Sequence, residues 1–371
     1  HHLAGPSARH NGPNCQPTRE MWVLIMKLDN PIVLPVNQFD HFYRGGDRIG
    51  ALRHGPGGPR RPEEWIGSAT ARFGQAPAGL TVLPDGTTLA EEISADPAAW
   101  LGADHVERFG TSTELLVKLL DLGQRLPVHL HPNRQFAHTH LGLAHGKTEA
   151  WYVLDAPPGA KVGVGFASQL SIDQVRDWVM NRDSSSLLSA LRTREVRPGD
   201  AMLVPAGLPH TVQDGVFVLE VQEPTDLSIL LEWDGFAVDG FSDGHLDLGF
   251  DTALQAVDTS AVSDSDLDKL VIPREEIDVG ALTSALPAEA DPYFRLHRIA
   301  PQSEGVQVEA GFAIAIAVDG KGVLSAGGSG HEITRGDALL MPHAAGDWSV
   351  SGDVTVMVCR PPDPRAPEAP R

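Results

Sequence analysis

The 371-residue chain has only two cysteines, Cys15 and Cys359. One lies in a polar N-terminal stretch and the other in an apolar run, so they provide no disulfide framework, and a reducing cytoplasm is the expected location. Basic residues are also scarce, with 29 lysines and arginines against 49 acidic residues and a formal net charge of −20. Nucleic acids and anionic membranes require positive patches, so this balance argues against both as partners.

Long hydrophobic runs are missing as well. The longest near the start, residues 21–26, is far too short to span a membrane. Residues 1–20 are polar and lack the basic-then-apolar order of a signal peptide. We therefore expect residues 1–25 to be a disordered leader, either upstream sequence or added residues, with the natural start at Met21 or Met26.

Glycine and proline, in contrast, are plentiful, with 38 and 29 residues. They separate many short runs of apolar and β-branched residues, which predicts a mainly β fold. Strands are expected at 115–120, 128–131, 149–154, 161–165, 201–204, 216–221, 227–231, 294–299, 312–318, 338–341 and 354–359. Helices are expected at 134–143 and 171–192, the second with a Ser171-x-x-Gln174 start. The chain is longer than one hydrophobic core usually supports, which favours two modules.

Two short patterns propose metal ligands. His129 and His131 are two apart on a predicted strand, so both side chains point to one face. The second pattern runs from Gly199 to His210, where a turn, a buried strand and Pro205-x-Gly207 deliver His210 to the interior. Glu149 offers a carboxylate between them. Three imidazoles and one carboxylate suit zinc first, with other divalent metals possible.

These patterns resemble the two half-motifs of the cupin barrel. Six segments also occur in the order seen in type I mannose-6-phosphate isomerases, a resemblance that runs from about Gln38 to the last strand. The motifs that carry the resemblance are highly specific in the middle third of the chain, whereas the C-terminal third matches the family only in its general character. The segments are Glu63-Glu-Trp-Ile-Gly67, Leu116-Val-Lys-Leu-Leu120, Val128-His-Leu-His-Pro132, Gly146-Lys-Thr-Glu-Ala-Trp151, Pro205-Ala-Gly-Leu-Pro-His210 and Val218-Leu-Glu-Val-Gln222.

The resemblance implies a jelly-roll cupin fold, and an internal echo suggests a second barrel. Residues 335–342 repeat the pattern of residues 198–205, but no His-x-His precedes them and the turn after them lacks the equivalent histidine. We expect a metal-binding cupin domain with helical insertions at 26–257, an exposed linker region at 258–290 and a degenerate cupin-like domain at 291–371.

The resemblance also implies site residues. The metal ligands fall on His129, where the family usually has Gln, and on His131, Glu149 and His210. The expected catalytic residues are Lys118, Lys147 and Asp226, and the expected substrate-binding residues are Glu64, Trp65 and Arg134. The residues alone leave alternatives open. Glu149 could be a buried partner of Lys147. Lys118 could be a side chain that extends along the sheet edge to solvent, and Asp226 could be a turn residue. Glu220 and Gln222 are candidates for orienting the ligands.

One position departs from the family pattern. The family has an arginine four residues after the position of Asp226, and this chain has Leu230 there. Leucine cannot replace the fork with which arginine binds phosphate. Arg44, Arg48, Arg53, Arg134 and Lys147 are candidates to compensate.

The resemblance implies a zinc-dependent isomerase that interconverts mannose 6-phosphate and fructose 6-phosphate through a cis-enediol. The loss of arginine at position 230 leaves two alternatives, an isomerase of an unphosphorylated aldose and a cupin that binds metal and sugar without turnover. A cupin dioxygenase that holds iron with three histidines and a glutamate is a further alternative, but it has no need for the paired lysines.

Overall fold

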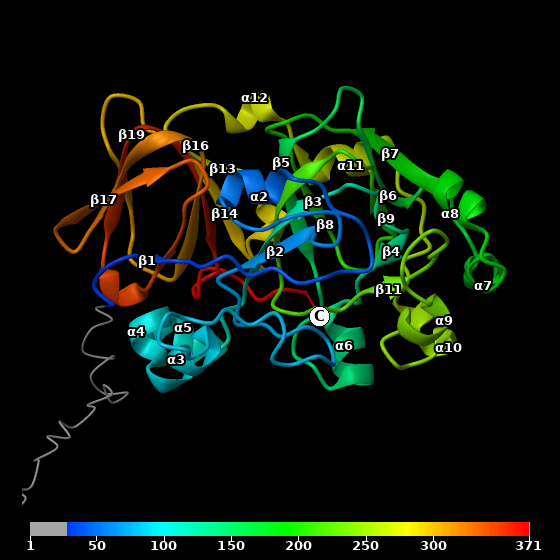
Figure 1. Ribbon diagram of the computed structural model, residues 1–371. Coiled ribbons are helices and arrows are strands. Elements are labelled where there is room, and N and C mark those ends of the chain that lie inside the picture. Colours follow the sequence, from blue (N-terminus) through cyan, green and yellow to red (C-terminus); the bar gives the residue numbers. More distant parts are fainter. Residues whose placement is uncertain (1–27, 371) are drawn as a thin grey trace, which may run out of the picture.

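The computed structural model describes residues 28–370. The predicted leader, Cys15 and the two proposed start methionines lie outside the described residues. Three β-sheets form the body of the molecule (Figure 1), so the mainly β prediction is confirmed. No helix in the described part of the chain is both long and apolar enough to cross a membrane.

Residues 63–272 contain two sheets that face each other, which we call the N-terminal sheets. The six-stranded sheet has the order β12 (Val271–Ile272), β8 (Ala201–Val204), β5 (Glu149–Asp155), β10 (Phe217–Gln222), β3 (Leu116–Asp121) and β2 (Glu63–Ile66). The five-stranded sheet has the order β11 (Ile229–Leu230), β4 (His129–Leu130), β9 (His210–Val212), β6 (Lys161–Phe166) and β7 (Leu191–Glu195). One hydrophobic cluster, with Val153 and Val218 from the first sheet and Val162 and Val212 from the second, joins them.

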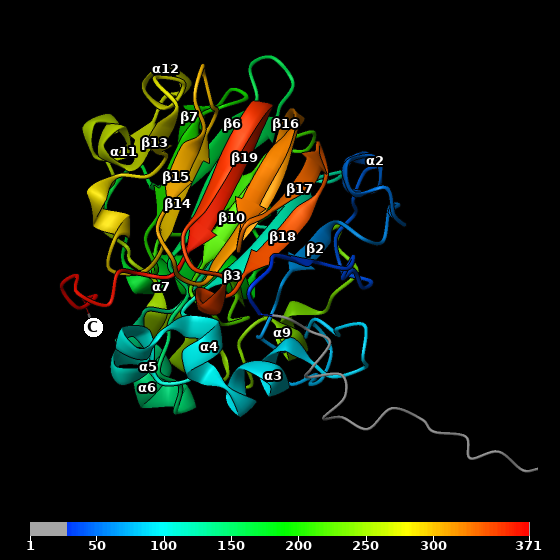
Figure 2. The ribbon, with the colours of Figure 1, turned by 90° about the vertical axis from the view of Figure 1, so that its left-hand side faces the viewer.

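The third sheet is C-terminal and has eight strands. Its main path is β1 (Ile32–Val33), β18 (Ala338–Met341), β16 (Ala313–Ala326), β19 (Trp348–Arg360), β14 (Arg295–Ile299) and β13 (Leu282–Ser284), while β15 (Val306–Val308) pairs with β19 and β17 (Ser329–Thr334) with β16. Figure 2 shows this sheet in front of β10, β3 and β2. Because Ile32 pairs with Leu340, the start of the described chain completes the C-terminal sheet.

The six-stranded sheet is therefore buried on both faces. Along β3, Val117 and Leu119 belong to the cluster shared with the C-terminal sheet, whereas Leu120 belongs to the cluster shared with the five-stranded sheet. Side chains alternate between faces along a strand, so Lys118 must point the same way as Leu120. This alternation places charged residues of β2, β3, β5 and β10 between the two N-terminal sheets.

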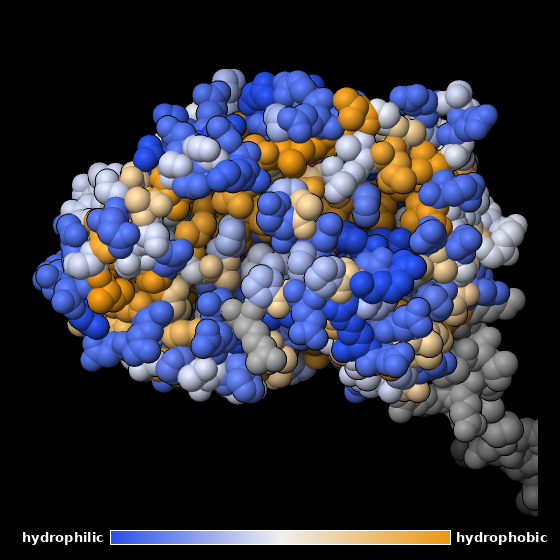
Figure 3. Space-filling view, turned by 180° about the vertical axis from the view of Figure 1, so that it is seen from behind, coloured by the Kyte–Doolittle hydropathy of each residue, from blue (hydrophilic) through white to orange (hydrophobic). Residues whose placement is uncertain are grey.

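Helices cover the edges and ends of the sheets (Figure 1). They are α2 (Arg48–Arg53), α3 (Leu89–Ala95), α4 (Pro97–Leu101), α5 (Ala103–Phe109), α6 (Arg134–Leu141), α7 (Ile172–Met180), α8 (Ser184–Ala190), α9 (Gly240–Asp243), α10 (Phe250–Ala253), α11 (Asp264–Leu270) and α12 (Arg274–Ile277), with 3-10 turns η1 (Leu254–Ala256), η2 (Ala288–Ala290) and η3 (His343–Ala345). Seen from behind, the surface mixes hydrophilic residues with smaller hydrophobic patches (Figure 3).

The predicted helix at 171–192 is correct at its start and wrong in its length. The Oγ atom of Ser171 accepts a hydrogen bond from the backbone N–H of Gln174, which caps α7. The chain then breaks at Arg182, which has a left-handed φ of 56°, and α8 and β7 follow. A left-handed residue cannot continue a right-handed helix, so one predicted helix becomes two helices and a strand.

Two segments where no strand or helix was predicted are ordered elements. Residues 63–66 form β2 and pair with β3. The segment 258–268, expected to be an exposed linker, contains the start of α11, where Ser263 and Asp266 form a capping box and Leu267 is buried. Val262 and Leu267 both belong to the hydrophobic cluster between the N-terminal sheets, and the polar composition around them hid this anchor.

Candidate metal centre and catalytic cavity

The predicted metal ligands come together between the two N-terminal sheets. His129 lies on β4 and His131 directly after it, and His210 is the first residue of β9, where it is the cross-strand partner of His129. Glu149 begins β5 in the facing sheet. All four side chains are buried. Ligands that are far apart in the sequence thus meet because two sheets pack face to face.

The distances between these side chains are those of a metal site. One nitrogen from each of the three histidines lies within 4.8 Å of the others, the one such cluster found in residues 28–370. The Oε2 atom of Glu149 is 3.0 Å from Nε2 of His131, and its Oε1 atom is 3.3 Å from Nε2 of His210. Four donor atoms therefore converge on one small volume.

Hydrogen bonds fix how the histidines face this volume. The Nδ1 atoms of His129, His131 and His210 lie 2.7, 2.7 and 2.8 Å from the backbone carbonyls of Pro127, Leu227 and Leu208. A carbonyl can only accept, so each Nδ1 carries the proton and each Nε2 presents its lone pair to the cavity. This arrangement is typical of histidines that bind metals.

The charges agree with that assignment. Burial and the neighbouring histidines hold the pKa of His129 well below its usual range, and burial and the Lys147 ammonium lower the pKa of His131 to about 3. Although burial alone would raise the pKa of Glu149, Lys147 and His131 bring it well below its usual value. Neutral imidazoles and an ionised carboxylate are the donor set that zinc and related divalent ions require, so these residues fit such an ion.

A cavity of about 450 Å³ opens beside the ligands. Lys118, Lys147 and Asp226, the predicted catalytic residues, all line it together with His129 and Glu149. Asp226 accepts a hydrogen bond of 2.9 Å from the backbone N–H of Phe73. The structure thus brings the three predicted catalytic residues to one cavity.

Lys118 sits in a buried charged cluster in that cavity. Its Nζ atom is 3.7 Å from carboxylate oxygens of both Glu63 and Glu220 and lies 4.6 Å from the ring centre of Trp65. Burial alone would lower the pKa of Lys118, but Glu63 and Glu220 raise it above its usual value. Lys118 is therefore a buried cation held between two carboxylates. Its side chain does not extend along a sheet edge to solvent.

Glu220 differs from the other carboxylates of the cluster. Its Oε2 atom accepts a hydrogen bond of 3.2 Å from the indole of Trp151, while Oε1 is buried without a hydrogen-bond partner. Burial and the negative charge of Glu149 raise the pKa of Glu220 to about 7. Sequence reasoning expected Glu220 and Gln222 to orient the metal ligands. Backbone carbonyls do that instead, and Gln222 donates to the carbonyls of Glu223 and Thr225.

Glu63 is a cavity residue that sequence reasoning missed. It accepts hydrogen bonds from Tyr43 at 2.7 Å and from the indole of Trp65 at 2.8 Å. Burial alone would raise its pKa, but Lys118 and His41 bring it below its usual value. Strand alternation was the available signal, because Glu63 and Trp65 share a face of β2 while Glu64 points the other way.

The predicted substrate-binding residues lie elsewhere. Glu64 is fully buried on the opposite face of β2, where it pairs with Arg53 at 3.0 Å. Arg134 pairs with Glu223 at 2.7 Å and does not line the cavity. Trp65 is fully buried behind Lys118 and contacts the cavity residues Lys118 and Glu63. Neither Glu64 nor Arg134 is placed to contact a substrate in this cavity.

Known proteins show the same combination of fold and sequence. The family model of the mannose-6-phosphate isomerase cupin domain matches residues 285–361. Mannose-6-phosphate isomerase of Streptococcus mutans is 28% identical over 291 residues, which cover 76% of this chain and 84% of that protein. Mannose-6-phosphate isomerase ManA of Bacillus subtilis is 26% identical over 245 residues, 66% of this chain and 73% of that protein. Over most of its length the chain is therefore similar to mannose-6-phosphate isomerases.

Solved structures of this family share the fold. The crystal structure of mannose 6-phosphate isomerase from Bacillus subtilis superposes with a TM-score of 0.68 at 23% identity, covering 89% of this chain and 99% of that one. A mutant of phosphomannose isomerase from Salmonella typhimurium gives a TM-score of 0.68 at 14% identity, covering 90% and 100%. The predicted cupin fold is therefore confirmed. The family model matches the C-terminal third, where the resemblance read from the sequence was least specific.

The departure from the mannose-6-phosphate isomerase pattern lies in the cavity itself, because Leu230 lines it. Most of the arginines suggested as replacements are engaged elsewhere: Arg48 pairs with Asp121, Arg53 with Glu64 and Arg134 with Glu223. Two arginines that sequence reasoning missed, Arg60 and Arg72, do line the cavity. They lie on either side of β2, in segments that carry no motif that would have marked them.

Proposed function

We propose that this protein is a metal-dependent aldose-ketose isomerase that interconverts mannose 6-phosphate and fructose 6-phosphate. The observation that carries this proposal is the convergence of His129, His131, His210 and Glu149 beside a cavity lined by Lys118, Lys147 and Glu220. The activity in the names of the Streptococcus and Bacillus relatives supports the choice of reaction. A cytoplasmic location remains a prediction from the cysteine content.

The four metal ligands are expected to hold zinc, with another divalent ion as the alternative. When bound there, the ion supplies Lewis-acid stabilisation of negative charge on the oxygens of the substrate. The chain's own contribution is to hold the donors rigidly, with each Nδ1 tied to a carbonyl, so that no reorganisation is needed when substrate binds.

The proton transfer between C1 and C2 requires a group that can take and return a proton near neutral pH. Glu220 suits this role because its Oε1 atom has no hydrogen-bond partner in the described part of the chain and it belongs to the cavity lining. Lys118, 3.7 Å away, stabilises the carboxylate when the proton has left. Lys147 and Asp226 are the remaining candidates for moving protons between the substrate oxygens during the passage through a cis-enediol.

The phosphate group needs a cation that is not already paired. Of the basic residues that line the cavity, Lys118, Lys147 and Arg60 each pair with a carboxylate. Arg72 has no carboxylate within 4.0 Å among the described residues, and its Nε atom is buried without a hydrogen bond. Its guanidinium packs over the ring of Phe39 at 4.5 Å, and its Nη1 atom donates one long hydrogen bond of 3.5 Å to the carbonyl of Asp40. We assign Arg72 as the phosphate-binding group in place of the arginine missing at position 230.

An isomerase of an unphosphorylated aldose is the second candidate, and Leu230 is the observation that favours it. The test is a substrate comparison with zinc-loaded protein, measuring fructose 6-phosphate from mannose 6-phosphate and ketose from mannose and lyxose. Preference for mannose 6-phosphate supports the first candidate. Turnover of only the free sugars replaces it with the second, and absence of turnover on all three would contradict an aldose-isomerase role.

A further inference from the structure

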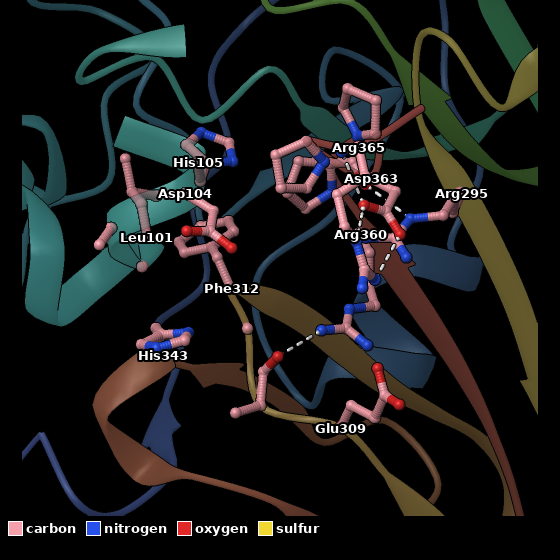
Figure 4. A pocket seen from close by; sticks show the side chains of 17 residues that line it. Leu101, Asp104, His105, Arg295, Glu309, Phe312, His343, Arg360, Asp363 and Arg365 are labelled. Atoms are coloured by element: carbon pink, nitrogen blue, oxygen red, sulfur yellow. Dashed lines mark hydrogen bonds and ion pairs between the residues drawn. The ribbon is translucent and has the colours of Figure 1, made fainter. Parts of the chain in front are cut away.

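A second cavity, of about 330 Å³, lies far from the metal ligands. It forms where strands β14 and β19 of the C-terminal sheet meet helices α4 and α5 and the C-terminal segment (Figure 4). Figure 4 shows Arg295, Arg360, Asp363 and Arg365 gathered on one side of it. No residue lines both this cavity and the metal cavity.

Two arginines of this cavity are neighbours in the sheet, and the charges of Asp363 and Glu309 act on both from beyond ion-pair distance. Arg295 on β14 and Arg360 on β19 are direct cross-strand partners, so their side chains leave the sheet on the same face. Like charges in that relation destabilise a sheet. Burial and the charge of Arg295 lower the pKa of Arg360 to about 10. The pair therefore needs negative charge nearby.

The chain supplies little of that charge. Within residues 28–370, neither arginine has a carboxylate within ion-pair distance. Asp363 is instead bound by Arg365, with Nη2 2.9 Å from Oδ2 and Nε 3.0 Å from Oδ1. The remaining carboxylates, Asp104 and Glu309, are exposed at the rim. A negative group at the centre of this cavity is what the two arginines lack.

Several N–H groups of the two arginines are free to bind it. The Nε of Arg295 donates to the carbonyl of Pro361 at 2.8 Å, and Nη2 of Arg360 donates to the carbonyl of Ala310 at 3.1 Å. The Nε of Arg360 is buried and has no hydrogen-bond partner among residues 28–370. A buried donor without a partner is costly, and its presence in a cavity indicates an absent acceptor.

We propose that the Arg295–Arg360 cavity is a second binding site for a phosphate group, either inorganic phosphate or a small phosphate ester. Two guanidinium forks match the oxygens of a phosphate dianion. The cavity is in the size range of sites that hold a metabolite. Because it is separate from the metal cavity, this proposal does not depend on the proposed isomerase activity.

The probe is inorganic phosphate, and its binding to the full-length protein is measured by calorimetric titration. Because the metal cavity is also expected to bind phosphate, the titration uses the R72M variant, which leaves the second cavity intact. We expect R72M to bind one phosphate per chain, and R72M/R360M to bind it at least about tenfold more weakly, the loss of one charge-assisted interaction. R72M/R295M, which changes the other arginine, is measured in parallel in case one variant fails to fold.

The matched control is R72M/R298M. Arg298 lies on the same strand, β14, but pairs with Asp278 at 3.1 Å and does not line the cavity, so this variant should bind phosphate like R72M. Melting temperature gives a second readout. Phosphate should raise it in R72M and R72M/R298M but not in R72M/R360M, and without phosphate R72M/R360M should melt no lower than R72M because a like-charge contact is gone.

The proposal is overturned if R72M, R72M/R360M and R72M/R295M bind phosphate with equal affinity. It is also overturned if R72M binds no phosphate. Titration with mannose 6-phosphate then distinguishes the two sources of the phosphate group. Tighter binding of the ester than of inorganic phosphate identifies an ester site, and the reverse identifies a phosphate site.

Discussion

The Nζ atom of Lys147 lies 3.0 Å from Nε2 of His131. It also lies 3.1 Å from Oε2 of Glu149. The lysine therefore interacts with two of the atoms that are proposed to hold the metal. An ammonium and a metal ion cannot share the same lone pair, so a bound ion would compete with the charge of Lys147, and we expect the lysine to be released from these atoms when the site is filled.

This competition gives the first prediction. The K147M variant should bind zinc at least as tightly as the wild type, because a repelling charge is gone, yet its kcat should fall by about 10²-fold or more through the loss of a proton-carrying group. Zinc affinity is measured by chelator competition and kcat on mannose 6-phosphate. K161M, at an exposed lysine of β6, is the control. Weaker zinc binding by K147M would show that the lysine supports the site.

The second prediction concerns pH. Because the pKa of Glu220 is raised to about 7, the carboxylate that accepts a proton is present above that pH and lost below it. We expect kcat/KM to rise as pH increases through about 7, and E220Q to remove this limb together with most of the activity. The pH profile of E107Q, at an exposed residue of α5, should match the wild type. If kcat/KM of E220Q still rises through about pH 7, a group other than Glu220 is responsible for the titration.

The third prediction tests Arg72. The R72M variant keeps the contact with Phe39 but loses the free guanidinium, so KM for mannose 6-phosphate should rise about tenfold or more while kcat changes little. R61M is the matched control, because Arg61 precedes β2 as Arg72 follows it, but Arg61 lies 3.6 Å from Asp40 and does not line the cavity. An unchanged KM in R72M would place the phosphate elsewhere.

The fourth prediction separates stability from function at Glu64. Arg53 donates to Glu64, and also to the carbonyls of Leu34 and of Gly336 in the C-terminal sheet. The R53M variant leaves a buried carboxylate unpaired and should lose about 3 kcal/mol of unfolding free energy, with KM unchanged. Urea denaturation measures the free energy of unfolding. R61M, which changes a half-buried arginine, should lose less than about 1 kcal/mol of it. A large change in the KM of R53M would indicate that Glu64 contributes to substrate binding.

Sequence reasoning predicted the parts of this protein that depend on local pattern. Strand alternation and the turn before His210 were enough to predict that His129, His131 and His210 face one interior. Glu149 was proposed as the carboxylate ligand from its position between these two patterns, and the resemblance implies the same role. The mainly β fold followed from many short apolar runs separated by glycine and proline.

The parts that were missed depend on tertiary contacts. Glu64 and Arg134 carry charge in promising segments, but pairing with Arg53 and Glu223 removes them from the cavity. Arg72 reaches the cavity because its loop folds back, where the backbone of Phe73 donates to Asp226. Nothing in the local sequence around Arg72 predicts that contact, since residues 73 and 226 are far apart in the chain.

The central claim is that turnover of mannose 6-phosphate depends on one divalent ion held by His129, His131, His210 and Glu149. The most direct measurement is a titration of chelator-stripped protein with zinc, following fructose 6-phosphate production and bound metal together. We predict activity that rises linearly and levels off at one ion per chain, and an H131A variant that neither retains the ion nor turns over. Full turnover by stripped protein, or none at one bound ion per chain, would contradict the account.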